Sequence, residues 1–205
     1  MPISLLRRRK PLIFIILIIF SGFIVYANSL LGQFIWDDAA FIKNNAYVKD
    51  WSKVIPIFTQ DSGAGASTEL GFYRPLQLFS YMIDYSLWGL NVTGYHITNI
   101  ALHILVSLAV YWLILLIFDN ILLAFFTALL FVIHPVHTEA VSYISGRGDS
   151  LSALFILLCL ILYIKNMHSL SIRSYIFMVL SCILAFLSKE NALAIPIFLL
   201  LYQYI

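Results

Sequence analysis

The stretch of sequence that decides the fold is residues 95–118, YHITNIALHILVSLAVYWLILLIF, which contains no Asp, Glu, Lys or Arg. An α-helix needs roughly 20 apolar residues to cross a bilayer, and this stretch is long enough. Its polar residues His96, Asn99 and His103 are spaced at i, i+3 and i+7, so they share one helix face. Polar groups inside a span face the bundle interior and bond to other helices. The stretch therefore predicts a membrane-spanning helix with packed neighbours.

The composition of the whole chain agrees with this prediction. Apolar residues make up 62% of the 205 residues and charged residues 11%, whereas soluble domains have about 45–50% and about 25%. A net charge of +2 without a basic, aromatic stripe gives no sign of a nucleic-acid partner. Cys159 and Cys182 lie inside apolar runs, which is typical of small core residues rather than a disulfide. We expect an all-α polytopic transmembrane helix bundle embedded in the lipid bilayer.

About six spans are expected. The first apolar run follows three arginines and Lys10, like a signal peptide, but it is longer than the usual apolar core of about 7–15 residues. We therefore expect an uncleaved signal anchor. The predicted spans are residues 11–27, 95–118, 121–133, 151–164, 175–187 and 192–205.

A long outer loop, residues 28–94, separates the first two spans. Residues 48–58 and 76–90 are amphipathic, and they predict short helices resting on the membrane surface. Between them, residues 62–67 (SGAGAS) predict a flexible stretch of small residues.

The distribution of Lys and Arg predicts the orientation of the bundle, because cytoplasmic loops are enriched in them. The basic residues before the first span place the N-terminus in the cytoplasm. Every acidic residue except Asp119 then lies on the non-cytoplasmic face. The segments expected on that face are residues 28–94, 134–150 and 188–191.

Trp36-Asp37-Asp38 follows the first span and forms the first candidate site. Adjacent carboxylates repel each other, so burial would raise the pKa of one towards the range useful to a general base. The same pair could hold a divalent cation, or both carboxylates could simply be solvated. All three interpretations remain open at this point.

Two arginines are suited to binding anions. Arg74 offers the paired donors that match phosphate or carboxylate, although it could equally pair with Asp84 or Glu69. Arg147 lies between two glycines at the start of a predicted helix, where helix N–H groups point towards an anion.

Two further clusters return polar groups to the same face. His137 and Glu139 belong to HPVHTE, which lacks the HExxH spacing, so we expect no zinc site. Lys189 and Glu190 join the last two spans, where a snorkelling turn is the plainer interpretation. Carboxylates, arginines, histidines and a lysine that converge on one face suit an enzyme acting on a membrane-embedded anionic substrate.

The sequence resembles a known family in several motifs. They are NSLLGQFIWDD (28–38), YRPL (73–76), GYHITNIALH (94–103), HPVHTEAVSYISGRGD (134–149) and LSKE (187–190). These motifs resemble the transmembrane and tetratricopeptide-repeat O-mannosyltransferases and their bacterial relatives, which belong to the C-type glycosyltransferases. The resemblance implies that residues 1–205 are the N-terminal part of a longer membrane module. GRGD replaces the more common GRAD of the family.

The resemblance also implies a mechanism. Asp37 or Asp38 would be the catalytic base of an inverting transfer from a polyprenyl-phosphate sugar to a protein hydroxyl or a glycan. The sugar expected is mannose or another hexose. Arg147 would meet the lipid phosphate. The remaining residues expected at the donor are Arg74, His137, Glu139, Asp149, Lys189 and Glu190.

A transporter and a membrane scaffold fragment are the alternatives to an enzyme. A transporter would place its ionisable groups near the middle of broken spans, whereas here they lie at span ends. A membrane scaffold fragment needs no convergent charges. The resemblance favours a bacterial cell membrane, or the endoplasmic reticulum membrane in a eukaryote, where Asn91-Val92-Thr93 would be a glycosylation sequon.

Overall fold

The computed structural model describes residues 10–168 and 171–203, and every regular element within them is a helix. The arginines before the first span lie outside the described residues. The α-helices are α1 (Lys10–Tyr26), α2 (Val54–Thr59), α3 (Pro75–Trp88), α4 (Val92–Phe118), α5 (Ile121–Ile133), α6 (Thr138–Ser142), α7 (Arg147–His168), α8 (Ile172–Ser188) and α9 (Ile195–Gln203). Short helical turns include η3 (Ala39–Lys43), η7 (Pro135–His137), η8 (Ile144–Gly146) and η9 (Glu190–Ala194).

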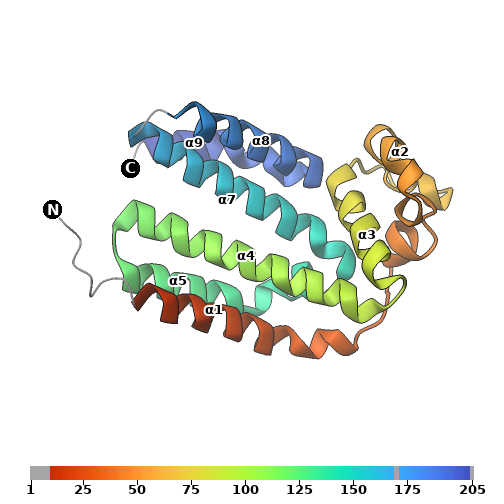
Figure 1. The fold of residues 1–205 in the computed structure, drawn as a ribbon, viewed down its shortest axis with the longest axis horizontal. Coiled ribbons are helices and arrows are strands. Elements are labelled where there is room, and N and C mark those ends of the chain that lie inside the picture. The colour runs from red at the N-terminus through yellow and green to blue at the C-terminus, as the bar shows by residue number, and fades with distance from the viewer. Residues whose placement is uncertain (1–9, 169–170, 204–205) are drawn as a thin grey trace.

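The long helices form a bundle in which successive helices reverse direction (Figure 1). α4 packs against α5 and α7, α1 packs against α4 and α5, and α7 packs against α8. α2 and α3 lie at the end of the bundle opposite the two chain termini (Figure 1). This arrangement confirms the expected helix bundle with a helical first loop.

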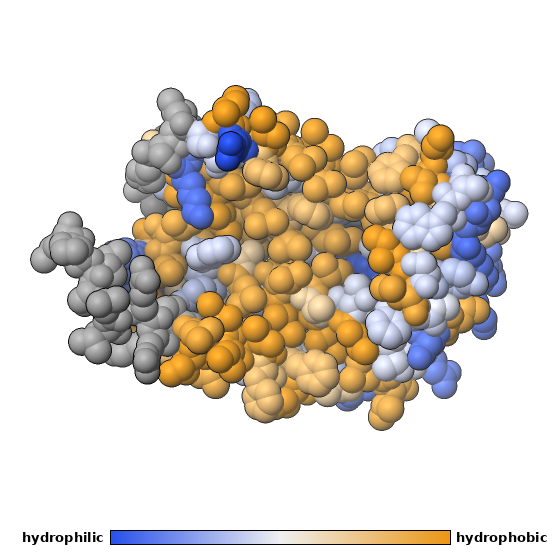
Figure 2. Space-filling view, in the orientation of Figure 1, coloured by the Kyte–Doolittle hydropathy of each residue, from blue (hydrophilic) through white to orange (hydrophobic). Residues whose placement is uncertain are grey.

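Hydrophobic residues cover the middle of the bundle, and hydrophilic residues gather at the end that carries α2 and α3 (Figure 2). On α1, the apolar side chains of Leu12 and Phe20 are 60% and 62% exposed, and most of the large apolar residues around them are exposed as well. A continuous apolar surface of this kind is unfavourable in water. By length and composition, three helices could cross a membrane: 12–31, 92–118 and 144–167. The bent pair 121–133 and 135–142 would make a fourth.

The predicted spans agree with helices in the structure, although their bounds differ. The third span, 121–133, coincides with α5, and the fourth starts at Arg147 instead of residue 151. The fifth corresponds to α8, with 17 residues, and the sixth to η9 and α9. α8 and α9 are shorter apolar helices, so the count of six spans stays a prediction.

The turn between α4 and α5 shows how local chemistry sets the reversal. Asp119 adopts a left-handed conformation with φ +46° and ends α4. The side chain of Asn120 then accepts hydrogen bonds from the backbone N–H groups of Leu122 and Leu123 and caps α5. Two residues therefore suffice to bring α5 back along α4.

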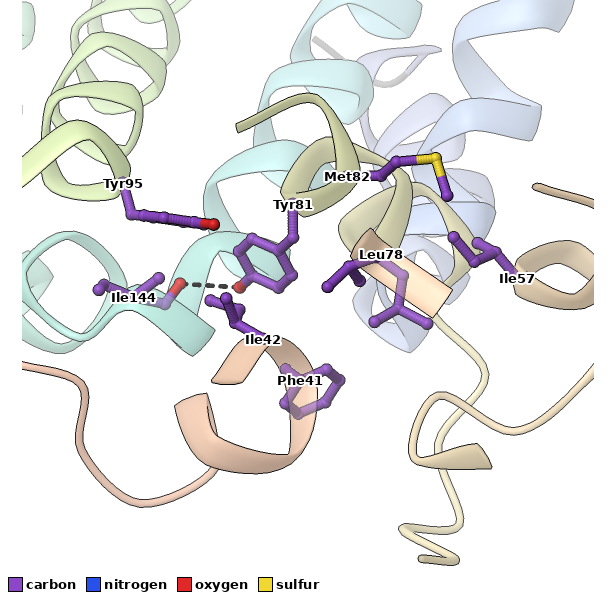
Figure 3. Close-up of a cluster of buried hydrophobic side chains, with 9 residues drawn as sticks. Phe41, Ile42, Ile57, Leu78, Tyr81, Met82, Tyr95 and Ile144 are labelled. Atoms are coloured by element: carbon purple, nitrogen blue, oxygen red, sulfur yellow. Dashed lines mark hydrogen bonds between the residues drawn. The ribbon is translucent and has the colours of Figure 1, made fainter. Parts of the chain in front are cut away.

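The outer loop packs against the bundle through a buried apolar cluster (Figure 3). Phe41 and Ile42 of η3 meet Tyr81 of α3 and Ile144 of η8. The Tyr81 hydroxyl donates a hydrogen bond to the carbonyl of Ile144 at 2.9 Å. α3 is therefore held between the loop and the ends of α4 and α7, and it contacts α8 as well.

The expectation of a flexible stretch at residues 62–67 differs from the structure, in which this stretch forms a compact turn. The carboxylate of Asp61 accepts hydrogen bonds from the backbone N–H groups of Gly63, Leu70 and Phe72. Ser62 is buried and its hydroxyl accepts from the Arg74 N–H. Small residues allow tight turns as well as motion, and here the hydrogen bonds to Asp61 hold them in a turn.

Candidate active site

Asp38 is a buried carboxylate that joins the first loop to the start of α7. Its side chain is fully buried and accepts hydrogen bonds from the Ser145 N–H at 2.9 Å and the Ser145 hydroxyl at 2.5 Å. Its second oxygen accepts from the Ile35 N–H at 3.0 Å. Burial raises the pKa of Asp38, and the hydrogen bonds from Ser145 and Ile35 oppose that rise. Asp38 therefore ties the first loop to η8 through hydrogen bonds inside the protein.

Asp37 has the opposite environment, because its side chain is exposed. Its backbone N–H donates to the hydroxyl oxygen of Tyr143 at 3.2 Å. Burial raises the pKa of the Tyr143 phenol to about 12, so this group stays protonated at neutral pH. The two carboxylates that the sequence could not distinguish are therefore divided into one internal and one accessible group.

Arg147 lies inside the bundle, with no exposed surface. Its Nη2 forms an ion pair with Asp84 of α3 at 2.5 Å, and its Nε donates to Asn99 of α4 at 2.7 Å. Its Nη1 donates to the Ser80 hydroxyl at 3.1 Å, and the guanidinium lies 4.5 Å from the centre of the Tyr81 ring. We call Arg147, Asp84 and Asn99 the buried clamp.

The buried clamp changes what was expected of Arg147. The sequence predicted an open anion site at this arginine, whereas the structure directs its guanidinium towards protein acceptors inside the bundle. The glycines on either side do allow close approach, since a Cβ on Gly148 would lie 2.6 Å from Oε1 of Gln77. The group that approaches Gly148 is therefore the side chain of Gln77 on α3, and not a bound anion.

Arg74 and Lys189 form ion pairs outside the clamp, and their side chains are 11% and 21% exposed. Arg74 forms a bidentate ion pair with Glu190, and Lys189 contacts both oxygens of Asp149 at 2.7 Å. Asn191 also donates to Asp149, at 3.0 Å. The sequence offered Asp84 or Glu69 as partners of Arg74, and both were wrong. Arg74 pairs with Glu190, and Asp84 pairs with Arg147 in the clamp.

The ion pair of Arg74 with Glu190 borders an open groove at the bundle end, through Glu190. The groove has a volume of about 520 Å³ and lies between the loop and α8. Its walls are aromatic and apolar, with one acid. The residues that line it are Gly71, Phe72, Tyr73, Phe186, Glu190 and Leu193. The Arg74 guanidinium lies 4.4 Å from the centre of the Phe72 ring, so a cation faces the rim of this groove.

His137 and Glu139 are placed elsewhere. The His137 ring packs against Phe131 at 4.2 Å and His103 at 5.2 Å between centroids, and Glu139 is exposed on α6. Residues 10–168 and 171–203 contain no group of three or more His, Cys, Asp or Glu arranged to hold a metal ion. A divalent cation at Asp37 and Asp38 stays a prediction, and Asp37 offers the accessible carboxylate of that pair.

The sequence did not single out Tyr143, Gln77 or Asp84 as site residues. Tyr143 and Gln77 are neutral, so no charge pattern marks them. Gln77 is buried and its amide donates to the Tyr81 hydroxyl and to the carbonyl of Ser145. Asp84 could have been found from the sequence, because it is the only charged residue of the largely aromatic and apolar α3. Such an acid is costly to bury without a partner, so it predicts a buried cation nearby.

Known proteins similar to the chain share one activity in their names. A Caenorhabditis elegans protein O-mannosyl-transferase is 37% identical over 190 residues, which cover 89% of this chain and 27% of that protein. The Mus musculus protein O-mannosyl-transferase TMTC1 is 41% identical, over 69% of this chain and 16% of its own length. The Homo sapiens protein O-mannosyl-transferase TMTC2 is 36% identical, over 71% and 18%.

The chain thus spans between 16% and 27% of the length of these relatives. No family model matches the chain. No solved structure is similar to it. The similarity nevertheless extends over most of the chain and includes the segments that carry Asp37, Arg74 and Arg147 in the bundle end described above. The chain therefore belongs to the transmembrane and tetratricopeptide-repeat protein O-mannosyltransferase group.

Proposed function

We propose that this bundle end transfers mannose from a polyprenyl-phosphate donor to a hydroxyl group of an acceptor protein. The observation that carries the proposal is the exposed carboxylate of Asp37, held beside Tyr143 and fixed by the buried Asp38. The relatives named as protein O-mannosyl-transferases support the sugar and the protein acceptor. The polyprenyl-phosphate donor rests on the resemblance of the sequence motifs.

The chemistry is an inverting displacement. The Asp37 carboxylate takes the proton of the acceptor hydroxyl, whose oxygen forms a bond to the anomeric carbon of the sugar. The bond between that carbon and the phosphate oxygen breaks, and its electron pair leaves with the lipid phosphate. General-base assistance of this kind contributes about 10²–10⁴-fold to the rate.

Arg74 and Lys189 are the cations suited to the leaving phosphate. The side chain of Arg74 is 11% exposed and that of Lys189 is 21% exposed, and each is paired with a more exposed carboxylate. Their carboxylate partners, Glu190 and Asp149, would be exchanged for phosphate oxygens on binding. Arg147 supports this site from inside, because the clamp holds α3, at whose start Arg74 lies.

The positions of these groups relative to α7 suit a sugar bound between them. Asp38 is hydrogen-bonded to Ser145 and Lys189 to Asp149, and four residue steps, about 6 Å of rise along a helix, separate these two contacts. Because residues four apart share one helix face, the loop that carries Asp37 and the cation Lys189 are held about one turn apart at the start of α7. A sugar phosphate placed across it would present its anomeric carbon to Asp37 and its phosphate to the cations.

The membrane that holds the enzyme is a separate part of the proposal. Animal relatives favour the endoplasmic reticulum over the bacterial membrane expected from the sequence motifs. In that membrane, the end carrying α2 and α3 would face the lumen. A protein acceptor with exposed hydroxyl groups would reach Asp37 there.

Release of polyprenyl phosphate and transfer of labelled mannose to an acceptor peptide test the proposal in the purified full-length protein. We expect Asp37→Asn to lower turnover about 10²–10⁴-fold with unchanged thermal unfolding, whereas the control Glu69→Gln, an exposed acid of the same loop, retains turnover. Full activity of Asp37→Asn would exclude this base. A folded wild-type protein that releases no polyprenyl phosphate would favour the scaffold alternative.

A further inference from the structure

We propose that Trp36 is the platform on which the pyranose ring of the mannosyl donor stacks, so that it contacts the substrate beside Asp37. This proposal rests on the proposed function and names the part of the site that recognises the sugar. Three independent observations lead to it: the exposure of the indole, its backbone conformation, and the groups that surround it.

The indole of Trp36 is 80% exposed, although tryptophan is among the largest apolar side chains. Most of its surface is therefore open to a ligand. The ring touches Tyr143 in an edge-to-face geometry, with 5.7 Å between the centroids and 72° between the planes. This contact orients the indole without covering it.

The backbone of Trp36 is strained, with a φ of +44°. A bulky residue rarely adopts this left-handed conformation, and such residues persist where the surroundings enforce them, often at ligand sites. Here the enforcing contact is Asp38, whose carboxylate accepts from the Ile35 N–H while its own N–H donates to the Ile35 carbonyl, both at 3.0 Å. A residue that only anchored the loop at the membrane surface would need no such turn.

The neighbours of the indole fit a sugar better than a phosphate or a lipid tail. One face of a pyranose ring is a patch of C–H groups, which packs on an aromatic face, and its hydroxyls need acceptors and donors close by. Asp37 supplies an exposed carboxylate and Tyr143 a protonated phenol. The Asp37 carboxylate would repel the phosphate, which therefore belongs at the cations beyond Ser145.

Equilibrium binding of two lipids to the purified full-length protein in detergent tests the proposal without requiring turnover. The probes are a short-chain polyprenyl-phosphate mannose and the matching methyl polyprenyl phosphate, a diester with the same single charge and no sugar. The measured quantity is the ratio of their dissociation constants, which isolates what the sugar contributes. In the wild type we expect the mannosylated lipid to bind about tenfold more tightly.

Trp36→Gly removes the ring and permits the left-handed backbone, so we expect it to reduce the ratio to about one while the sugar-free diester binds as before. Trp36→Phe keeps a smaller ring and should retain about a third of the preference. The matched control is Trp51→Ala, which removes an exposed tryptophan of the same loop and should leave the ratio unchanged.

Two results would overturn the proposal. One is a wild-type protein that binds both lipids equally. The other is a Trp36→Gly variant that keeps the preference for mannose, or that loses affinity for both lipids alike, as a membrane anchor would. Transfer activity in the separate assay reports on the proposed function, so a failure of Asp37 as base and a failure of Trp36 as platform are distinguished.

Discussion

The ion pair between Arg147 and Asp84 should be worth far more to the fold than the ion pair between Arg74 and Glu190. The first is buried on both sides, with side chains 0% and 4% exposed, whereas in the second Arg74 is 11% exposed and Glu190 is 56% exposed, so that solvent reaches this pair through its carboxylate. Removing one partner of a buried pair leaves an uncompensated charge and costs about 3–5 kcal/mol. Solvent screens the exposed pair, for which about 0.2–1 kcal/mol is typical.

The two pairs can be compared by double-mutant cycles. Arg147→Ala, Asp84→Ala and the double variant form one cycle, and Arg74→Ala with Glu190→Ala forms the other. Each single variant of the clamp should lower the free energy of unfolding by about 3–5 kcal/mol, and the double variant by less than the sum of the two. We expect a coupling energy of about 2–3 kcal/mol in the clamp and below about 1 kcal/mol in the exposed pair.

The assay is unfolding by SDS titration in mixed micelles, followed by circular dichroism. Asp84→Asn is a milder variant that keeps an oxygen towards Nη2 of Arg147, and it serves if the alanine variants do not fold. Equal coupling energies in the two cycles would refute the reasoning, because burial would then have no bearing on the strength of the pair. Additive losses in the clamp would refute it as well.

Two further predictions concern the contacts around α7. Burial raises the pKa of Asp38, so between the pKa of the unfolded chain, about 4, and the higher pKa of the folded protein only the folded protein keeps the proton. This contribution to stability is fully present below about pH 4 and is lost as the pH rises through the folded pKa. Unfolding measured across this range should therefore show wild type losing stability relative to Asp38→Asn as the pH rises, and a constant difference would contradict the assignment. Gly148→Ala should cost about 1–3 kcal/mol in thermal unfolding, because the new Cβ would displace Gln77 from the carbonyl of Ser145; an unchanged unfolding temperature would show that Gln77 is not needed there.

The gathering of polar groups at one end could be predicted from the sequence. Alternating spans place residues 28–94, 134–150 and 188–191 at the same end of the bundle, whatever the details of packing. The contacts of Asp38 with Ser145 and of Lys189 with Asp149 confirm that prediction. Such a result depends on the order of the spans alone, which the hydropathy of the chain determines.

The choice of partners could not be predicted, because it depends on the position of α3. An amphipathic pattern over residues 76–90 indicates a helix with one apolar face, but it does not say whether that face lies on lipid or on protein. In the structure α3 packs against α4, α7 and α8, and Asp84 is brought to Arg147. Arg74, left without Asp84, pairs with Glu190 across 116 residues. Sequence spacing carries no information about a contact of that separation.

The proposed roles follow from how five of the acids at this end are compensated. Asp84, Asp149 and Glu190 each face a cation, and Asp38 is held by hydrogen bonds inside the protein. Ion pairing stabilises the charged form of a carboxylate and makes it a weaker base, and burial without access to solvent keeps a base from its substrate. Asp37 alone among these five residues is exposed without an ion pair to a described cation. The same geometry that fixes its neighbours therefore leaves the carboxylate of Asp37 exposed, as its proposed role as the base requires, next to the strained Trp36 proposed to hold the sugar.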